Sequence, residues 1–146
     1  MTAGRALRIA SHHLARIGEE ARFALPRECC GLLLGRETID GWQVTELVTS
    51  PNVAPADRHD RFEIDPQILI AVQKRLRREG GAMIGVYHSH PNGRATPSDT
   101  DLAQAWQIGK IWVIAALSAD APLSLGAFLR TDTAFAPVPV IAEGTG

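Results

Sequence analysis

Residues 82–109 constrain the fold of this chain more than any other stretch. The apolar run AMIGVYHSH (82–90) is predicted as a strand, and SDTDLAQAWQIG (98–109) as a helix. Between them the pair Asn92-Gly93 signals a tight turn, which returns the chain toward the end of the strand. The last residues of this strand and the first residues of this helix are therefore expected to lie close together.

The start of that helix has two alternative registers. In one, Ser98 is the N-cap and Asp101 returns to its amide, a capping box that stabilises a helix by about 1 kcal/mol. In the other, Thr96 is the N-cap, Pro97 takes the first helical position and Asp99 completes the box. We favour the second register, because proline is preferred at that position. Ser98 and Asp101 then lie three apart on one helix face without a capping role.

Two further helices are predicted. Ser11 is expected to cap the first, which Pro26 ends. The second begins at Asp65 and Pro66, where the aspartate accepts from free amides and proline supplies a preset φ, and it runs to Gly80. The inner faces are predicted as Leu14, Ile17, Ala21 and Leu25 in the first helix and as Leu69, Val72 and Leu76 in the second.

The strand pattern completes the fold prediction. The prolines of residues 134–141 place that strand on a sheet edge. Helices and strands alternate along the chain, so the fold class is α/β or α+β with a mixed sheet. A chain of 146 residues suits one domain, which we expect over residues 1–146. The other strands are predicted at 30–35, 42–48, 110–118 and 123–130.

Composition excludes several classes of partner. The formal net charge of −1 gives no electrostatic reason to expect nucleic acid. No apolar run has the length of a membrane span and no signal-peptide pattern begins the chain, so we expect no membrane partner and a cytoplasmic location. Cys29 and Cys30 are adjacent and lack the spacing of zinc knuckles. Any metal ligands are therefore expected to be nitrogen and oxygen atoms, and Cys30 is expected as a small core residue.

The histidines of the strand are candidate metal ligands. Side chains alternate along a strand, so His88 and His90 share one face while Tyr87 and Ser89 share the other. This spacing alone indicates a metal only weakly, but Asp101 adds a carboxylate from the start of the helix. Two histidines and one carboxylate leave zinc a fourth, open position, as in catalytic sites.

A hydrolytic site needs two more groups. Zinc lowers the pKa of water at an open position from about 15.7 toward about 7. A base must then take a proton, and a donor must stabilise the oxyanion. Ser98 is a candidate donor, although capping a helix is its ordinary role. The base must come from another part of the chain.

A resemblance to a known family rests on five short segments: ECCG at 28–31, GLLLG at 31–35, RFEIDP at 61–66, HSHP at 88–91 and PSDTD at 97–101. Ten residues separate His90 from Asp101. With this spacing, the segments together resemble the JAMM (MPN-plus) zinc metalloproteases, in particular the short, stand-alone bacterial members. The resemblance extends from the first helix to at least the strand at 111–118.

The resemblance implies a role for each candidate residue. His88, His90 and Asp101 would bind one Zn²⁺ per chain. Glu28 would be the general base and acid, and Ser98 would donate to the oxyanion. Without the resemblance, Glu28 would be interpreted as an ordinary surface charge. The implied fold is a single domain with a curved, mixed β-sheet flanked by helices, related to the cytidine-deaminase fold.

The resemblance also implies a substrate class. Family members hydrolyse amide or isopeptide bonds, often after the C-terminal glycine of a ubiquitin-like protein. The short loop between His90 and Ser98 carries no insertion that could grip ubiquitin, so the implied substrate is the Gly-Gly tail of a ubiquitin-like sulfur carrier, lying alongside a strand near the zinc. One alternative is a non-catalytic scaffold of the same fold. Another is a zinc deaminase, but its H-x-E and P-C-x-x-C motifs do not occur in the sequence.

Overall fold

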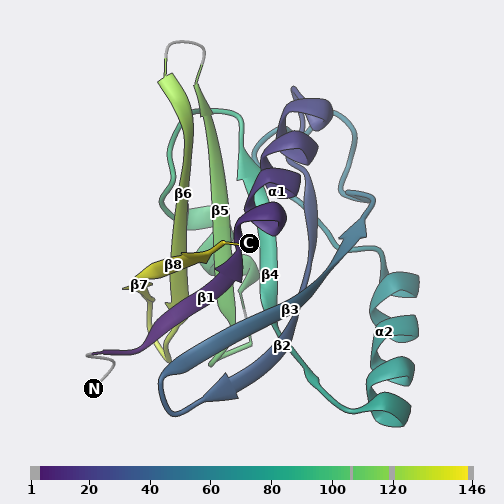
Figure 1. Cartoon of the computed structure of the whole chain (residues 1–146). Coiled ribbons are helices and arrows are strands. Elements are labelled where there is room, and N and C mark those ends of the chain that lie inside the picture. Colours follow the sequence, from purple (N-terminus) through teal and green to yellow (C-terminus); the bar gives the residue numbers. More distant parts are fainter. Residues whose placement is uncertain (1–3, 106, 119–120, 145–146) are drawn as a thin grey trace.

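The computed structural model describes residues 4–105, 107–118 and 121–144 of the chain. This part contains eight strands and three helices (Figure 1). The strands are β1 (Ala6–Ala10), β2 (Cys30–Thr38), β3 (Gly41–Ser50), β4 (Ala82–His90), β5 (Ile111–Ser118), β6 (Ala121–Arg130), β7 (Phe135–Val138) and β8 (Val140–Glu143). The helices are α1 (Ser11–Ala24), α2 (Pro66–Glu79) and α3 (Asp99–Gln104).

The strands form one mixed sheet in the order β7-β6-β5-β4-β2-β3-β1-β8. The pairs β1 with β3, β1 with β8 and β4 with β5 are parallel, and the remaining pairs are antiparallel. The predicted α+β class, a single domain with a curved mixed sheet flanked by helices, is confirmed.

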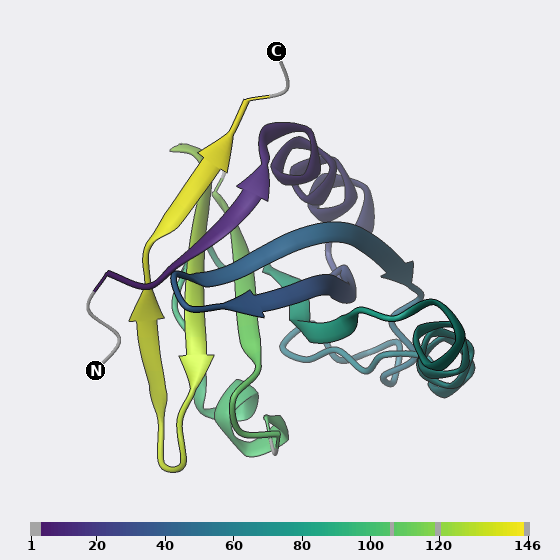
Figure 2. The same ribbon diagram turned by 60° about the horizontal axis from the view of Figure 1, so that its bottom comes forward.

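The sheet curves until its two edge strands meet. β7 and β8 are joined through Pro139, yet they stand at opposite ends of the strand order, and Figure 2 shows one running on into the other. The carbonyl of Pro139 accepts a hydrogen bond from the amide of Leu7 at 2.8 Å. The prediction of a single strand over 134–141 is therefore wrong: this segment forms two strands, because the curled sheet brings both of its edges within reach of one extended segment. Both lie at an edge, as predicted.

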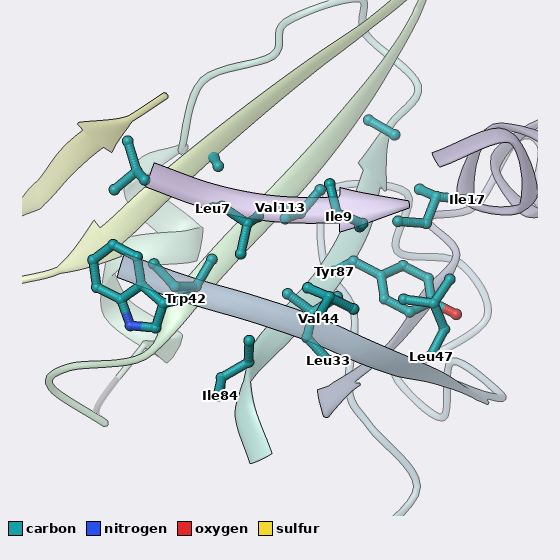
Figure 3. Close-up of a cluster of buried hydrophobic side chains, with 14 of the residues drawn as sticks. Leu7, Ile9, Ile17, Leu33, Trp42, Val44, Leu47, Ile84, Tyr87 and Val113 are labelled. Carbon is teal, nitrogen blue, oxygen red and sulfur yellow. The ribbon is translucent and has the colours of Figure 1, made fainter. Parts of the chain in front are cut away.

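The apolar run of β2 is explained by burial on both faces of the sheet. Leu33 packs on the face that α1 covers, in one cluster with Ile17 (Figure 3). Leu32 and Leu34 pack on the opposite face, against Val72 of α2. A central strand that is covered on both sides needs a continuous apolar run instead of alternation. β4 lies next to β2 and is fixed by the same two layers.

Helix α2 begins and packs as predicted. Asp65 is the N-cap, and its Oδ1 accepts the amide of Gln67 at 2.9 Å. Val72 is buried, with Leu69 and Leu76 packed beside it. Among the described residues, no helix combines the length and the apolar surface that crossing a bilayer requires.

The start and the end of α1 differ from the prediction. β1 runs into α1 without a loop, so the N-cap is Ala10, and Ser11 is the first helical residue instead of the cap. Ile17 and Ala21 are buried as predicted, but Leu25 follows the last helical residue and is 48% exposed. The inner face of α1 therefore ends one turn earlier than the pattern predicts.

Candidate metal centre

Strand β4 presents two imidazoles from the middle of the sheet. It pairs with β2 along one edge and with β5 along the other, so its backbone is fixed on both sides. His88 and His90 are 0% and 4% exposed, and they point to the face opposite Tyr87. The Nε2 atoms of the two histidines lie 3.1 Å apart. Both rings therefore point at the same place.

Asp101 reaches the histidines from the first turn of α3, in the register that we did not favour. Ser98 is the N-cap: its Oγ accepts the amide of Asp101 at 3.0 Å, while Asp101 Oδ2 accepts the amide of Ser98 at 2.9 Å. The prediction of Thr96 as N-cap and Pro97 as the first helical residue is wrong. Both registers offer a capping box, but only the box of Ser98 and Asp101 also places the Asp101 carboxylate against His88 and His90, and this outweighs the preference of proline for the first position.

Helix α3 is also shorter than the predicted 98–109. It ends at Gln104, and the carbonyl of the next residue, Ala105, accepts a hydrogen bond from Arg130 Nε at 2.6 Å. At Ala105 the backbone leaves the helical region, with φ −86° and ψ 69°, so the helix does not continue. Trp106, which the prediction included, lies outside the described residues.

The backbone fixes which nitrogen of His90 carries the proton. Nδ1 lies 2.7 Å from the carbonyl oxygen of Arg94, which can only accept, so the neutral ring is protonated there. Nε2 then directs a lone pair at Asp101 Oδ2, 3.0 Å away, and at His88 Nε2. Facing lone pairs repel unless a proton or a cation lies between them. Histidines that bind metals are held in this way, with the second nitrogen bonded to a carbonyl or carboxylate.

The carboxylate oxygens at this place have few protein partners. Glu28 Oε1 is buried without a hydrogen-bond partner among the described residues, and Asp101 Oδ1 has only the Nε2 atom of His88 beside it, at 3.2 Å. Burying a carboxylate oxygen without a partner is unfavourable unless a cation compensates. One ligand atom from each of Glu28, His88, His90 and Asp101 lies within 4.8 Å of the others. This set of nitrogen and oxygen donors fits a divalent metal such as Zn²⁺.

Burial and mutual contacts shift the pKa values of three of these groups. Burial lowers the pKa of His88, which keeps that ring neutral. Burial opposes the ionisation of Asp101, but its hydrogen bonds with the two imidazoles hold the pKa of Asp101 below the usual range. Burial also lowers the pKa of His90, yet the contact with Asp101 outweighs burial and the pKa is raised. A proton and a metal ion therefore compete for the Nε2 atom of His90.

Glu28 joins the cluster from the segment between α1 and β2. Its side chain is 2% exposed, so it is not a surface charge. Burial raises the pKa of Glu28 to about 8; His90 opposes this shift and Asp101 adds to it. A carboxyl whose pKa lies near neutrality can both accept and release a proton in one reaction cycle.

Two residues that the sequence did not single out hold this arrangement in place. Ser89 bridges β4 to the Glu28 segment: its Oγ accepts the amide of Cys29 at 2.8 Å, and its own amide donates to the carbonyl of Cys29 at 3.2 Å. Phe62 stacks on the ring of His88 with 4.4 Å between centroids. The position of Phe62 in RFEIDP is the one sequence signal for it, and Ser89 had none beyond its place between the histidines.

A pocket of about 410 Å³ opens onto the cluster. Residues 57–60 line one part of it, and Pro91, Asn92 and Ser98 line another, with Glu28 and His90 also at its wall. Ser98 is exposed, and a hydroxyl that accepts one hydrogen bond still has its proton to donate. His59 also borders this pocket.

The strands beside the cluster lie inside the sheet. Among the described residues, β2, β4 and β5 each have a neighbouring strand on both sides, and the pairing of β4 with β2 ends at His88. The expectation that a substrate tail lies alongside a strand near the metal stays a prediction. An extended chain that enters the pocket has to lie between the loops at 57–60 and 91–98.

Comparison with known proteins identifies the family. Residues 10–126 match the prokaryotic homologs of the JAB domain. The chain belongs to this family. The JAB domain is 37% identical over 95 residues to a probable TtuB-protein conjugate cleaving protease of Thermus thermophilus, a match that covers 62% of this chain and 60% of that protein. It is 33% identical over 101 residues to a desampylase of Haloferax volcanii, covering 69% of this chain and 70% of that protein.

Solved structures of similar proteins share the whole JAB fold. A protein from Desulfitobacterium hafniense has a TM-score of 0.83 at 27% identity, over 94% of this chain and 93% of that chain. A protein from Salinibacter ruber has a TM-score of 0.69 at 30% identity, over 94% and 91% of the two chains. The predicted resemblance to short, stand-alone JAMM proteins is confirmed.

The cysteines of the JAB domain lie beside the cluster but have a different character. Cys30 is fully buried, as predicted, and burial raises its pKa to about 12. Burial likewise raises the pKa of Cys29 to about 11. Both remain thiols at neutral pH, which disfavours them as ligands or nucleophiles.

Proposed function

We propose that this JAB-domain protein is a zinc-dependent isopeptidase that cleaves the amide bond after the C-terminal Gly-Gly of a ubiquitin-like protein. The observation that carries the proposal is the buried convergence of His88 Nε2, His90 Nε2 and the Asp101 carboxylate, with the proton of the neutral His90 ring held on Nδ1 by the carbonyl of Arg94. Such an arrangement is stabilised by a cation.

In this proposal His88, His90 and Asp101 hold one Zn²⁺ per chain. Bound there, zinc would act as a Lewis acid that polarises the substrate carbonyl and makes water acidic enough to attack it at neutral pH. The rest of the reaction depends on proton transfer and charge stabilisation by side chains of this chain.

Glu28 is proposed as the proton carrier. Its carboxylate takes a proton from the attacking water as the oxygen of that water bonds to the carbonyl carbon. It then gives the proton to the amine nitrogen as the carbon–nitrogen bond breaks. A pKa raised to about 8 by burial supports both steps, because a base near neutrality is strong enough to accept and weak enough to release.

Ser98 is proposed to stabilise the oxyanion. Its Oγ is oriented by the amide of Asp101, which leaves the hydroxyl proton to point into the pocket that Ser98 lines. The capping role and the catalytic role are therefore compatible, since one uses the oxygen as acceptor and the other uses the proton. Loss of such a donor typically costs about 100- to 1,000-fold in kcat.

The proposed substrate class has two supports. The similar proteins from Thermus and Haloferax are named for cleaving TtuB conjugates and for desampylase activity. The pocket of about 410 Å³ between two loops suits a slender tail such as Gly-Gly more than a bulky side chain. The ubiquitin-like protein is therefore the acyl side of the scissile bond, and the leaving amine comes from the molecule attached to it.

The test compares Glu28→Gln with Asp101→Ala. Glu28→Gln should keep about one zinc per chain and lose turnover, because only the proton carrier is removed. Asp101→Ala should lose zinc as well, and a chelator should inactivate the wild type. The substrate is a ubiquitin-like carrier joined through Gly-Gly to a lysine, with an unrelated unfolded peptide as control. Full turnover by Glu28→Gln would contradict the assigned base, equal cleavage of the control peptide would contradict the substrate class, and a metal-free, inactive protein would indicate a scaffold.

A further inference from the structure

The side chain of Asn52 uses all of its hydrogen-bonding capacity on backbone groups. Its Nδ2 donates to the carbonyl of Glu28 at 3.0 Å and to that of Arg61 at 3.2 Å. Its Oδ1 accepts from the amides of Ala54 at 3.1 Å and Glu63 at 3.0 Å. One amide side chain thus joins the Glu28 segment to two points of the loop that follows β3.

This loop contributes directly to the metal centre. It closes where Asn52 pairs with Ile64 in an isolated β-bridge. Between these residues it carries Phe62, which stacks on His88, and residues 57–60, which line the pocket. Arg27 reinforces the closure by donating to the carbonyl of Asn52 at 3.1 Å. Asn52 therefore lies at the point where the loop and the Glu28 segment are joined.

The peptide unit between Glu28 and Cys29 is held at both of its polar groups. Its carbonyl accepts from Asn52 Nδ2 at 3.0 Å, and its amide donates to Ser89 Oγ at 2.8 Å. Fixing both ends of a peptide plane fixes the Cα atom of the residue before it. The chain on the other side is also held, because the amide of Arg27 donates to the carbonyl of Ala24 at 2.9 Å, and together these bonds restrict the direction of the Cα–Cβ bond between them. Here that residue is Glu28, whose Oε1 has no hydrogen-bond partner of its own in the described part of the chain.

We infer that Asn52 is a positioning residue, which orients the Glu28–Cys29 peptide and thereby aims the carboxyl of Glu28 at the pocket. The inference rests on the proposed function in one respect, namely that Glu28 is the proton carrier. Displacing such a group by about 1 Å can cost on the order of 100-fold in rate. Asn52 also joins this peptide to the loop between Asn52 and Ile64.

Amide hydrogen exchange tests the inference without an activity assay. In Asn52→Ala, the amides of Cys29, Ala54 and Glu63 should all exchange at least about 10-fold faster than in the wild type. Asn52→Asp keeps the acceptor oxygen and loses both donors, so only Cys29 should exchange faster. Gln43→Ala is the matched control, because Gln43 is another half-buried amide, whose Nε2 donates to backbone carbonyls and to Glu143, far from the centre.

Kinetics of the same variants give a second readout. Both Asn52 variants should keep zinc, lower kcat by about 10- to 100-fold and change KM by less than about threefold. Adding Asn52→Ala to Glu28→Gln should cause no further loss, because both changes act through the same carboxyl. Unchanged exchange at Cys29, or a rise in KM with kcat intact, would overturn the inference and leave Asn52 as a loop residue.

The two proposals fail in different ways. If Glu28→Gln keeps full turnover, the role of Glu28 fails while exchange at Cys29 still reports whether Asn52 holds the peptide. If Glu28→Gln is inactive and Asn52→Ala matches Gln43→Ala in kcat and in Cys29 exchange, the isopeptidase proposal stands and the positioning role is contradicted.

Discussion

The two faces of β4 carry polar side chains of opposite character. On one face, the hydroxyl of Tyr87 donates to Glu20 Oε1 at 2.7 Å, and Glu20 Oε2 accepts from Thr49 and from Arg16, each at 2.9 Å. On the other face, His90 converges with His88 on the carboxylate of Asp101, beside Glu28 Oε1, which has no hydrogen-bond partner among the described residues. Polar groups with protein partners on all sides stabilise a fold, whereas converging groups without them are available to a ligand.

The face of β4 that carries Tyr87 is closely packed. Tyr87 lies opposite Gly31 in the register between β4 and β2. A Cβ at Gly31 would come within 2.4 Å of the tyrosine ring, so the glycine provides the space that the ring occupies. The phenol then reaches past β2 to Glu20. The sequence feature ECCG therefore serves both faces: its glutamate belongs to the candidate metal centre and its glycine makes room for Tyr87.

The largest expected effect comes from removing an imidazole from the face of β4 that carries His88 and His90. His88→Gln should reduce zinc from about one per chain to nearly none and reduce hydrolysis of the lysine conjugate by about 1,000-fold or more. Tyr87→Phe changes the neighbouring residue on the other face, and it should keep zinc and remain within about threefold of wild-type kcat. Metal analysis and turnover of the two variants measure this difference directly. Equal zinc contents would remove the distinction between the faces.

The pH dependence of the metal-free protein should also distinguish the faces. Burial raises the pKa of Glu28 from 4.5 to about 8, so between these values the folded state holds a proton that the unfolded state has lost. The free energy of unfolding should therefore fall as pH rises through this window, by up to about 1.4 kcal/mol per pH unit. The pKa of Asp101 is lowered from 3.8, so its ionised form stabilises the folded state. This contribution to the free energy of unfolding is lost only as pH falls below that value.

Urea unfolding of metal-free wild type and Glu28→Gln checks this dependence. The difference in free energy of unfolding between the two proteins should change by a few kcal/mol between about pH 5 and pH 8, with Glu28→Gln gaining relative stability as pH rises. A difference that stays constant across this range would show that Glu28 is not desolvated in the folded protein.

A smaller effect is expected from the hydroxyl of Tyr87. Tyr87→Phe leaves Glu20 Oε1 without its donor at 2.7 Å, which should lower the free energy of unfolding by about 1–3 kcal/mol. The same measurement on zinc-loaded protein should give the same loss, because the hydroxyl does not act through the metal. A loss that depended on zinc would instead connect the two faces.

The smallest effect concerns the thiols. With pKa values raised to about 11 and about 12 by burial, Cys29 and Cys30 should be alkylated far more slowly at pH 8 in the folded protein than in urea. Mass spectrometry after iodoacetamide treatment measures the rate for each. Rapid alkylation of Cys29 in the folded state would show that the Glu28 segment opens to solvent.

The sequence predicted the members of the site better than their local geometry. His88 and His90 share a face because strand alternation is a backbone property, and this follows from sequence alone. The register of α3 does not follow from sequence alone. Capping boxes were possible at Thr96 and at Ser98, and the proline preference favoured Thr96, the start that did not form. The reciprocal bonds of Ser98 and Asp101 decided the register, and Asp101 reaches the histidines while it caps the helix.

Contacts between distant segments were the part that the sequence could not provide. Nothing local shows that Glu28 meets His90, and only the family resemblance connected them. The bonds from Asn52 to Glu28 and from Ser89 to Cys29 depend on how β3 and β4 lie beside that segment in the folded sheet. The division of residues 134–141 into two strands likewise depends on the closure of the whole sheet.

The central claim is that the buried lone pairs of His88, His90 and Asp101 surround one divalent cation. Anomalous diffraction at the zinc absorption edge, from crystals of the purified wild-type protein, tests it most directly. We expect one strong peak per chain between the two Nε2 atoms and the carboxylate of Asp101. Crystals soaked in zinc that show no peak there, with His90 bonded directly to Asp101, would contradict it.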